Sequence, residues 1–308
     1  MDSHETWPKS SPKSTVVRHP EFYFADGSII LIIEKTALRI HQSVLTHHSE
    51  VFKGLWDVPQ LSKLEMYDGC PSVVLSDSVN NLIDVMRPSH FDKIAPETSL
   101  MELVTFISGI LRISTKYGML QIRQKCISII QDKFPSMLAG CDNILRCKIQ
   151  YMPSEIIRVI PLAREMNIPH VLPWAFYLCA QISVEELLEN QMLSWQDKAL
   201  CLAGKENLWE MQCTVTHTFL LNFWPSPHCS TGCKMRMPTT FTLKDFESLR
   251  TSPHLLGEYQ DWTGLRLCAK CQAFAQAQHQ EGREKVWQKL PGLFHLGTWD
   301  DIFKDQSC

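Results

Sequence analysis

Apolar positions near the N-terminus change from a strand-like to a helical spacing. An apolar, β-branched run over residues 29–33 and a second short segment over 37–40 flank the polar residues Glu34-Lys35-Thr36. Apolar runs separated by a short polar turn predict a β-hairpin. After His41 the apolar residues recur at three- and four-residue intervals through Leu55. This spacing predicts a helix directly after the hairpin.

Short strands and helices continue along the next part of the chain. Residues 72–76 predict a further strand, residues 79–86 predict a short helix, and two longer amphipathic helical segments follow. We therefore expect an α+β domain over residues 18–135. Residues 1–17 are polar and contain Ser, Pro and Lys, so we expect a disordered tail that cannot bury enough apolar surface to fold.

Beyond Pro135 the pattern is almost entirely helical. Pro161 is expected to kink or split its helix, and residues 205–224 predict one long amphipathic helix. The candidate N-cap residues are Ser154, Ser183 and Ser194. We therefore expect a helical C-terminal domain over residues 136–308.

Several segments share their residues with one known family. They are Asp26-Gly27-Ser28-Ile29-Ile30-Leu31, Leu38-Arg39-Ile40-His41-Gln42-Ser43-Val44-Leu45, Ser49-Glu50-Val51-Phe52, residues 111–117, 162–167 and 172–177, and residues 287–294 with Trp299. Together they resemble BTB/POZ domain proteins of the type abundant in mushroom-forming fungi. The resemblance implies that residues 18–135 form a BTB/POZ domain, a small sheet flanked by helices.

The same resemblance implies a non-enzymatic protein-interaction module. BTB domains commonly form homodimers through an N-terminal strand and the first helix, so we expect a homodimer or another protein partner. The apolar residues expected at this seam are Phe22, Phe24, Leu45, Phe52, Leu55 and Trp56. The alternative that the family offers is a substrate adaptor for a cullin-type ubiquitin ligase. Residues 57–76 do not match the short hydrophobic-x-Glu element of cullin-binding members.

Charge and hydropathy narrow the classes of partner. The chain has 30 basic and 33 acidic residues, a net charge of −3, and neither side of Pro135 is basic. Most nucleic-acid-binding proteins depend on a basic surface, so we expect no nucleic-acid partner. No apolar run approaches the ~20 residues of a membrane span, and the first 17 residues lack the apolar core of a secretory signal. We therefore expect an intracellular protein, cytoplasmic or nuclear, with no membrane partner and no small-molecule substrate.

Four of the 12 cysteines form two close pairs, Cys229 with Cys233 and Cys268 with Cys271. Two thiolate pairs on short turns supply the tetrahedral sulfur shell of a structural zinc site. His228 is the reserve ligand. Two other interpretations stay open, namely unliganded cysteines packed in a helical domain and a redox pair. The sequence therefore indicates structural zinc as the one candidate cofactor.

Catalytic motifs do not support an enzyme. The chain has no H-E-x-x-H, no G-x-S-x-G and no phosphate-binding glycine loop. A zinc-dependent hydrolase is a remote alternative, because a catalytic zinc needs an open coordination position and a general base nearby. We therefore assign no catalytic residue.

Overall fold

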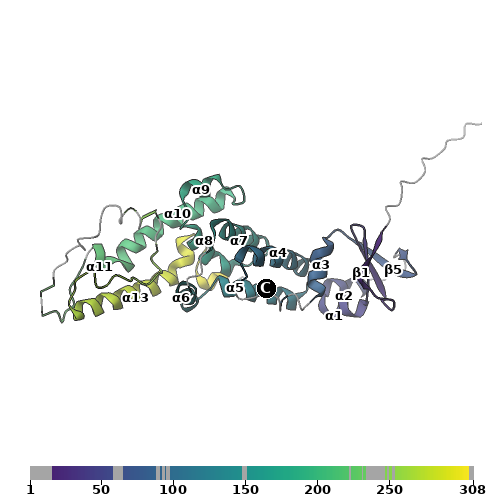
Figure 1. Ribbon diagram of the computed structural model, residues 1–308, viewed down its shortest axis with the longest axis horizontal. Helices are drawn as coiled ribbons and strands as arrows, with labels where there is room; N and C mark the ends of the chain where they lie inside the picture. The colour runs from purple at the N-terminus through teal and green to yellow at the C-terminus, as the bar shows by residue number, and fades with distance from the viewer. Residues whose placement is uncertain are drawn as a thin grey trace, which may run out of the picture. The chain divides into compact units, whose positions relative to one another are not determined.

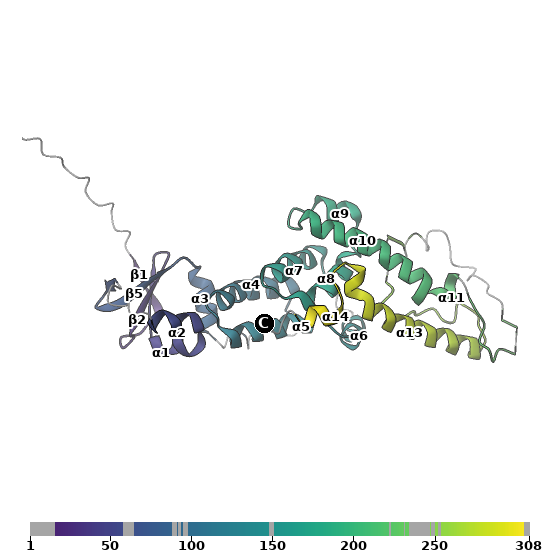
Figure 2. The same ribbon diagram turned by 180° about the vertical axis from the view of Figure 1, so that it is seen from behind.

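The computed structural model describes residues 16–57, 65–87, 91, 94, 98–147, 151–221, 223–230, 232–233, 247, 250–251 and 254–304. It shows a mixed α+β chain with a five-stranded sheet near the N-terminus followed mostly by helices (Figures 1 and 2). The described residues fall into two compact units. The first contains residues up to 98 together with 105–126, and the second contains 99–104 together with the residues from 127 onwards. Residues 1–15 of the expected tail lie outside the described residues, whereas Val17 already belongs to a strand.

The first unit alternates strands and short helices. Its elements are β1 (Val17–Tyr23), β2 (Ile29–Ile33), β3 (Thr36–Ile40), α1 (Gln42–His48), α2 (Glu50–Asp57), β4 (Met66–Tyr67), β5 (Cys70–Leu75) and α3 (Val79–Met86). Parts of two longer helices, α4 (Leu100–Lys116) and α5 (Leu120–Lys133), complete it.

The sheet has the strand order β1-β3-β2-β5-β4. β2 and β3 pair antiparallel, with Ile29 opposite Ile40 and Ile33 opposite Thr36, which confirms the predicted hairpin. β5 lies parallel to β2 on one side, and β1 lies parallel to β3 on the other. β1 contains Pro20, which has no amide hydrogen to donate, and its pairing is irregular between Arg18 and Tyr23. Such a strand suits the edge of a sheet.

The helix predicted after the hairpin is two helices in the structure, α1 and α2, which are separated at Ser49. Ser49 adopts an extended backbone conformation. Its Oγ accepts the amide hydrogen of Phe52 at 3.0 Å and donates to the carbonyl oxygen of Tyr117. A buried serine hydroxyl that caps one helix and also bonds to another segment can separate two helices, even where the helical spacing of apolar residues continues. The prediction of a single helix was therefore wrong.

The second unit is helical. Besides its parts of α4 and α5, it contains α6 (Leu138–Arg146), α7 (Pro153–Glu165), η3 (Pro169–Val171), α8 (Leu172–Cys179), α9 (Val184–Glu189), α10 (Trp195–Met211), η4 (Gln212–Thr216), α11 (Thr218–Leu221), α13 (Ala269–Leu293) and α14 (Trp299–Lys304). Its buried core includes Trp174, Phe176, Phe294 and Leu290. Helices α10 and α13 lie side by side in this unit (Figures 1 and 2).

Two of the three predicted helix caps are confirmed. Ser183 and Ser194 accept the amide hydrogens of Glu186 and Asp197, respectively, at the starts of α9 and α10. Ser154 is not a cap, because α7 begins one residue earlier at Pro153. At that end Glu155 accepts the amide hydrogen of Met152 at 2.8 Å.

Two further helix predictions, at Pro161 and over residues 205–224, can be compared with the structure. Helix α7 continues through Pro161 to Glu165, so the proline does not split it. The long helix predicted over 205–224 is interrupted by η4, a π-helical turn. A Cβ atom on Gly282 of α13 would lie 2.7 Å from the carbonyl oxygen of Val215, so only glycine allows α13 to approach this turn so closely.

None of the helices in the described residues combines the length and the apolar character that a membrane crossing requires.

Candidate functional site: a four-cysteine cluster and an apolar groove

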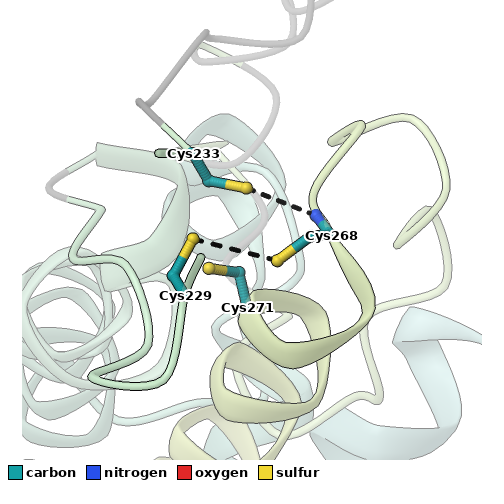
Figure 3. Close-up of side chains that lie close together, drawn as sticks. All are labelled: Cys229, Cys233, Cys268 and Cys271. Carbon is teal, nitrogen blue, oxygen red and sulfur yellow. Dashed lines mark hydrogen bonds between the residues drawn. The ribbon is translucent and has the colours of Figure 1, made fainter. Parts of the chain in front are cut away.

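The four cysteines singled out in the sequence come together in the second unit (Figure 3). The Sγ atoms of Cys229, Cys233, Cys268 and Cys271 all lie within 4.8 Å of one another. Cys229 and Cys268 have their sulfurs 3.9 Å apart. Zinc–sulfur bonds of about 2.3 Å place the sulfurs of a tetrahedral site about 3.8 Å apart. The separation of Cys229 from Cys268 is therefore that of two ligands of one metal ion, and it is too long for a disulfide bond.

Local backbone geometry brings each pair of cysteines together. Cys268 is the N-cap of α13, and Cys271 lies in the first turn of that helix. Cys229 closes a turn in which its amide donates to the carbonyl oxygen of Ser226 at 2.9 Å. Gly232 then adopts a left-handed conformation with φ of +62°, directly before Cys233. Glycine takes this conformation without the cost that a Cβ atom imposes.

Two backbone amides donate hydrogen bonds to the cysteine sulfurs. The amide of Cys268 donates to the Sγ of Cys233, and the amide of Ser226 donates to the Sγ of Cys271, each at 3.4 Å. Such bonds stabilise thiolates, as does the positive end of the α13 dipole. The ligand sulfurs of a Zn(Cys)4 site carry negative charge, so these donors suit metal-bound cysteines.

Burial separates Cys271 from the other three cysteines. Cys271 is fully buried, whereas the others are partly exposed. Burial raises the pKa of the Cys271 thiol to about 12, an effect that the amide of Ser226 opposes. A metal cation removes that cost because it binds the thiolate directly.

A buried apolar cluster includes residues on both sides of Cys268 and Cys271 in the sequence. Phe219, Leu220, Leu265 and Ala275 form a buried group, against which Tyr259 and Trp262 pack. His279 of α13 links this group to the preceding turn, because its Nδ1 lies 2.8 Å from the carbonyl oxygen of Thr216 and its Nε2 accepts the amide hydrogen of Tyr259 at 3.2 Å. Leu265 and Ala275 of this cluster flank Cys268 and Cys271 in the sequence, so packed side chains anchor the start of α13 on both sides.

His228, the reserve ligand, does not belong to the cluster. Among the described residues the candidate metal ligands that converge here are the four cysteines. The amide of His228 donates to Ser226 Oγ at 3.3 Å. The role of Ser226 could not be predicted from its residue type, because its contribution is a backbone amide whose direction depends on the turn.

The second feature is an apolar groove in the first unit, with a volume of about 600 Å3. Its lining includes Phe22, Phe24, Val44 and Leu45. Val44 is 54% exposed and Phe24 is 41% exposed. The side chains of His41, His48 and Lys125 add polar atoms to the lining. The imidazole of His41 stacks on Phe24 and lies 3.6 Å from the carboxylate of Asp26, and it makes no helix-capping bond.

The six residues expected at a dimer seam occupy different environments. Phe22 and Phe24 both line the groove. Phe22 is half-buried and Phe24 is exposed. Leu45 also lines the groove but is almost fully buried. Phe52 is buried between Tyr117 and Trp56, on which it stacks, and Leu55 is exposed on α2. Val44 has a larger exposed fraction than any of the six. The sequence pattern does not identify it, because helical spacing alone does not show which edge of the apolar stripe stays uncovered.

The chemistry of the two features is distinct. Four thiolates fill a tetrahedral shell and leave no position for substrate, which is the arrangement of a structural metal site. A concave apolar surface with a few polar side chains suits the binding of a ligand or of apolar side chains. Comparisons with family models, with curated proteins and with solved structures find no match to this chain.

Proposed function

We propose that this chain is a non-enzymatic protein-interaction protein of the BTB/POZ type, whose first unit binds a second copy of the chain. The observation that carries the proposal is the apolar groove beside β1 and α1, where Phe24 and Val44 expose large apolar surfaces. Exposed apolar patches of this kind mark interaction sites in proteins.

The order of elements in the first unit supports the family assignment. The β2–β3 hairpin leads directly into two short helices, then into β5, α3 and the helical pair α4 and α5. This is the small sheet with flanking helices that the resemblance implies. The first helix, α1, contributes Val44 and His48 to the groove.

A second copy is the occupant that we propose for the groove. Most side chains that line the groove are apolar, and the polar side chains of His41, His48 and Lys125 lie among them. A partner therefore needs no complementary charge to bind there. The equivalent strand and helix of a second copy offer the same exposed Phe24 and Val44, and two copies of one patch make a self-complementary interface. Burial of these side chains would supply the binding free energy at ~25 cal/mol per Å2.

Structural zinc is the second part of the proposal. Cys229, Cys233, Cys268 and Cys271 would hold the ion and connect the segment that carries Cys229 and Cys233 to the start of α13. The S–S separations and the two amide donors support this assignment. The ion would stabilise the second unit and would take no part in a reaction.

Sedimentation velocity over a range of concentrations tests the interaction. We expect the full chain to dimerise reversibly, and Phe24→Ser and Val44→Ser each to raise the dimer dissociation constant about tenfold or more. The matched control is Val74→Ser in the same unit, because Val74 is 70% exposed and lies away from the groove lining. Equal weakening by all three substitutions, or none, would contradict the proposal.

A further inference from the structure

Four exposed apolar side chains lie on α9, in the turn that follows it and at the start of α10. Val184 and Leu188 lie one helical turn apart on α9, Met192 lies in the connecting turn, and Trp195 begins α10. Trp195 is 75% exposed, and the other three are also exposed. We call these four residues the Trp195 patch. Figure 1 shows α9 and α10 joined by a short turn within the second unit.

Trp195, the largest side chain of the Trp195 patch, is held in place by a buried lysine. The ammonium of Lys198 lies 4.4 Å from the centre of the Trp195 ring and donates to the carbonyl oxygen of Leu188 at 2.7 Å. Lys198 itself is buried. Its ammonium therefore fixes the indole against the end of α9 through a cation–π contact and a helix-terminal hydrogen bond.

The turn beneath Met192 is equally well fixed. Asn190 Oδ1 accepts the amide hydrogens of Met192 at 2.8 Å and Leu193 at 3.2 Å. Leu193 is buried, which anchors the turn to the core of the unit. An indole that is already held in place, on a turn whose backbone is already fixed, loses little conformational entropy when it binds a partner.

The rim of the Trp195 patch is acidic. Glu185, Glu186 and Glu189 are all exposed on α9. Residues 182–197 contain no lysine or arginine, and Lys198 is buried beneath Trp195. Arg164 of α7 lies close to the start of α10, where it is paired with the carboxylate of Asp197. An apolar centre with carboxylates at its rim is complementary to an apolar segment flanked by basic side chains, and unfavourable to an anionic membrane surface.

We infer that the Trp195 patch is a docking site for a basic amphipathic helix of a partner protein. Trp195 is the anchor, because exposed and pre-ordered tryptophans carry a large share of the free energy in protein interfaces. The three carboxylates select the basic partner and speed its association. This inference does not depend on the proposed self-association, since the patch lies wholly within the second unit.

The probe for the test is a short amphipathic helical peptide of leucine and lysine, titrated into the full chain by calorimetry. Its control is the same peptide with glutamate in place of lysine. We expect saturable binding of the lysine peptide with micromolar affinity and much weaker binding of the glutamate peptide. Trp195→Ala should weaken binding about tenfold or more, and Glu185→Gln with Glu189→Gln should weaken it severalfold and reduce its salt dependence.

Matched substitutions elsewhere in the unit separate the patch from general charge effects. Leu145→Ala removes an exposed leucine outside the Trp195 patch, and Glu210→Gln removes an exposed carboxylate near the end of α10. Both variants should bind the lysine peptide as the unmodified chain does. Equal affinity for the two peptides, or binding that survives Trp195→Ala unchanged, would overturn the inference.

Two other occupants give different results. Binding of anionic phospholipid vesicles that is lost in Trp195→Ala would overturn the inference in favour of a membrane surface. A dimer dissociation constant that rises in Trp195→Ala would overturn it in favour of a second copy. Neither result would be mistaken for failure of the groove proposal, which Phe24→Ser and Val44→Ser test separately.

Discussion

The amide of Cys268 donates a hydrogen bond to the Sγ of Cys233, 3.4 Å away, although the two residues come from different cysteine pairs. Cys268 also lies with its sulfur 3.9 Å from that of Cys229. The N-cap of α13 therefore contacts both cysteines of the first pair. Any ion held there connects two segments that lie far apart along the chain.

Metal content gives the first test of this cluster. We expect one zinc ion per chain by elemental analysis, and we expect Cys268→Ser to remove it, because a serine hydroxyl is a poor replacement for a thiolate ligand. Loss of a structural metal should lower the free energy of unfolding by about 2 kcal/mol or more. Cys147→Ser is the matched control, since Cys147 is exposed and lies outside the cluster. Full zinc content in Cys268→Ser would refute the assignment.

Substitution of Gly232 should disturb the four-cysteine cluster less than substitution of a cysteine does. Its φ of +62° favours glycine, and among the described residues, apart from its chain neighbours, no atom lies within 4 Å of the place where a Cβ atom would stand. Gly232→Ala should therefore cost only the backbone strain, about 1 kcal/mol, and should weaken zinc binding about fivefold in a chelator competition. Gly54→Ala is the contrast, because Gly54 also has open space but lies in helix α2 without a positive φ. It should leave zinc affinity unchanged and stabilise the first unit slightly.

The buried ion pair of Arg283 and Asp142 should be sensitive to the loss of one partner. Arg283 is almost fully buried on α13, contacts the carboxylate of Asp142, and donates to the carbonyl oxygen of Leu256 at 2.9 Å. Arg283→Met leaves Asp142 and that carbonyl oxygen without their donor, so we expect a loss of about 3 kcal/mol in urea unfolding. An exposed ion pair gives the comparison, since Lys285→Met removes the partner of Glu281 and should cost less than about 1 kcal/mol. Similar losses for both variants would contradict this account.

The second unit should lose stability in mild acid. Burial, together with the neighbouring His279, lowers the pKa of His217 to about 3, so the folded chain keeps this imidazole neutral. The unfolded chain takes up a proton near its ordinary pKa of 6.5. Stability from this group is therefore complete above pH 6.5 and is lost as the pH falls towards 3.

Thermal unfolding at a series of pH values measures this effect. His217→Gln should be less stable at neutral pH but should show a smaller decrease between pH 6.5 and 4, because one titrating group is gone. His228→Gln is the control, since His228 lies in the turn before Cys229 and is exposed. An unchanged pH dependence in His217→Gln would show that another group governs the acid response.

Much of the framework followed from local signals in the sequence. The β2–β3 hairpin was predicted because its two apolar runs flank a short polar turn, and the caps at Ser183 and Ser194 because serine precedes a helix with an acidic residue in its first turn. The cysteine cluster was also predicted, since close pairs of thiols carry their own geometric signal.

Other features depend on contacts between distant segments, which spacing does not reveal. Ser49 divides a helix because its hydroxyl reaches the carbonyl oxygen of Tyr117. The parallel pairing of β1 with β3 depends on how the chain returns across the sheet. The Trp195 patch was not foreseen, because an apolar residue at a helix start is typical of a buried face, and only the fold shows that Trp195 stays exposed.

We propose that the first unit associates with a second copy of the chain through the apolar groove. Light scattering coupled to size-exclusion chromatography measures the mass in solution most directly. We expect a mass approaching twice the chain mass of 35.4 kDa at high micromolar concentration, and a decrease towards one chain mass in the double variant Phe24→Ser, Val44→Ser. A mass of one chain at every concentration of the unmodified protein would contradict it.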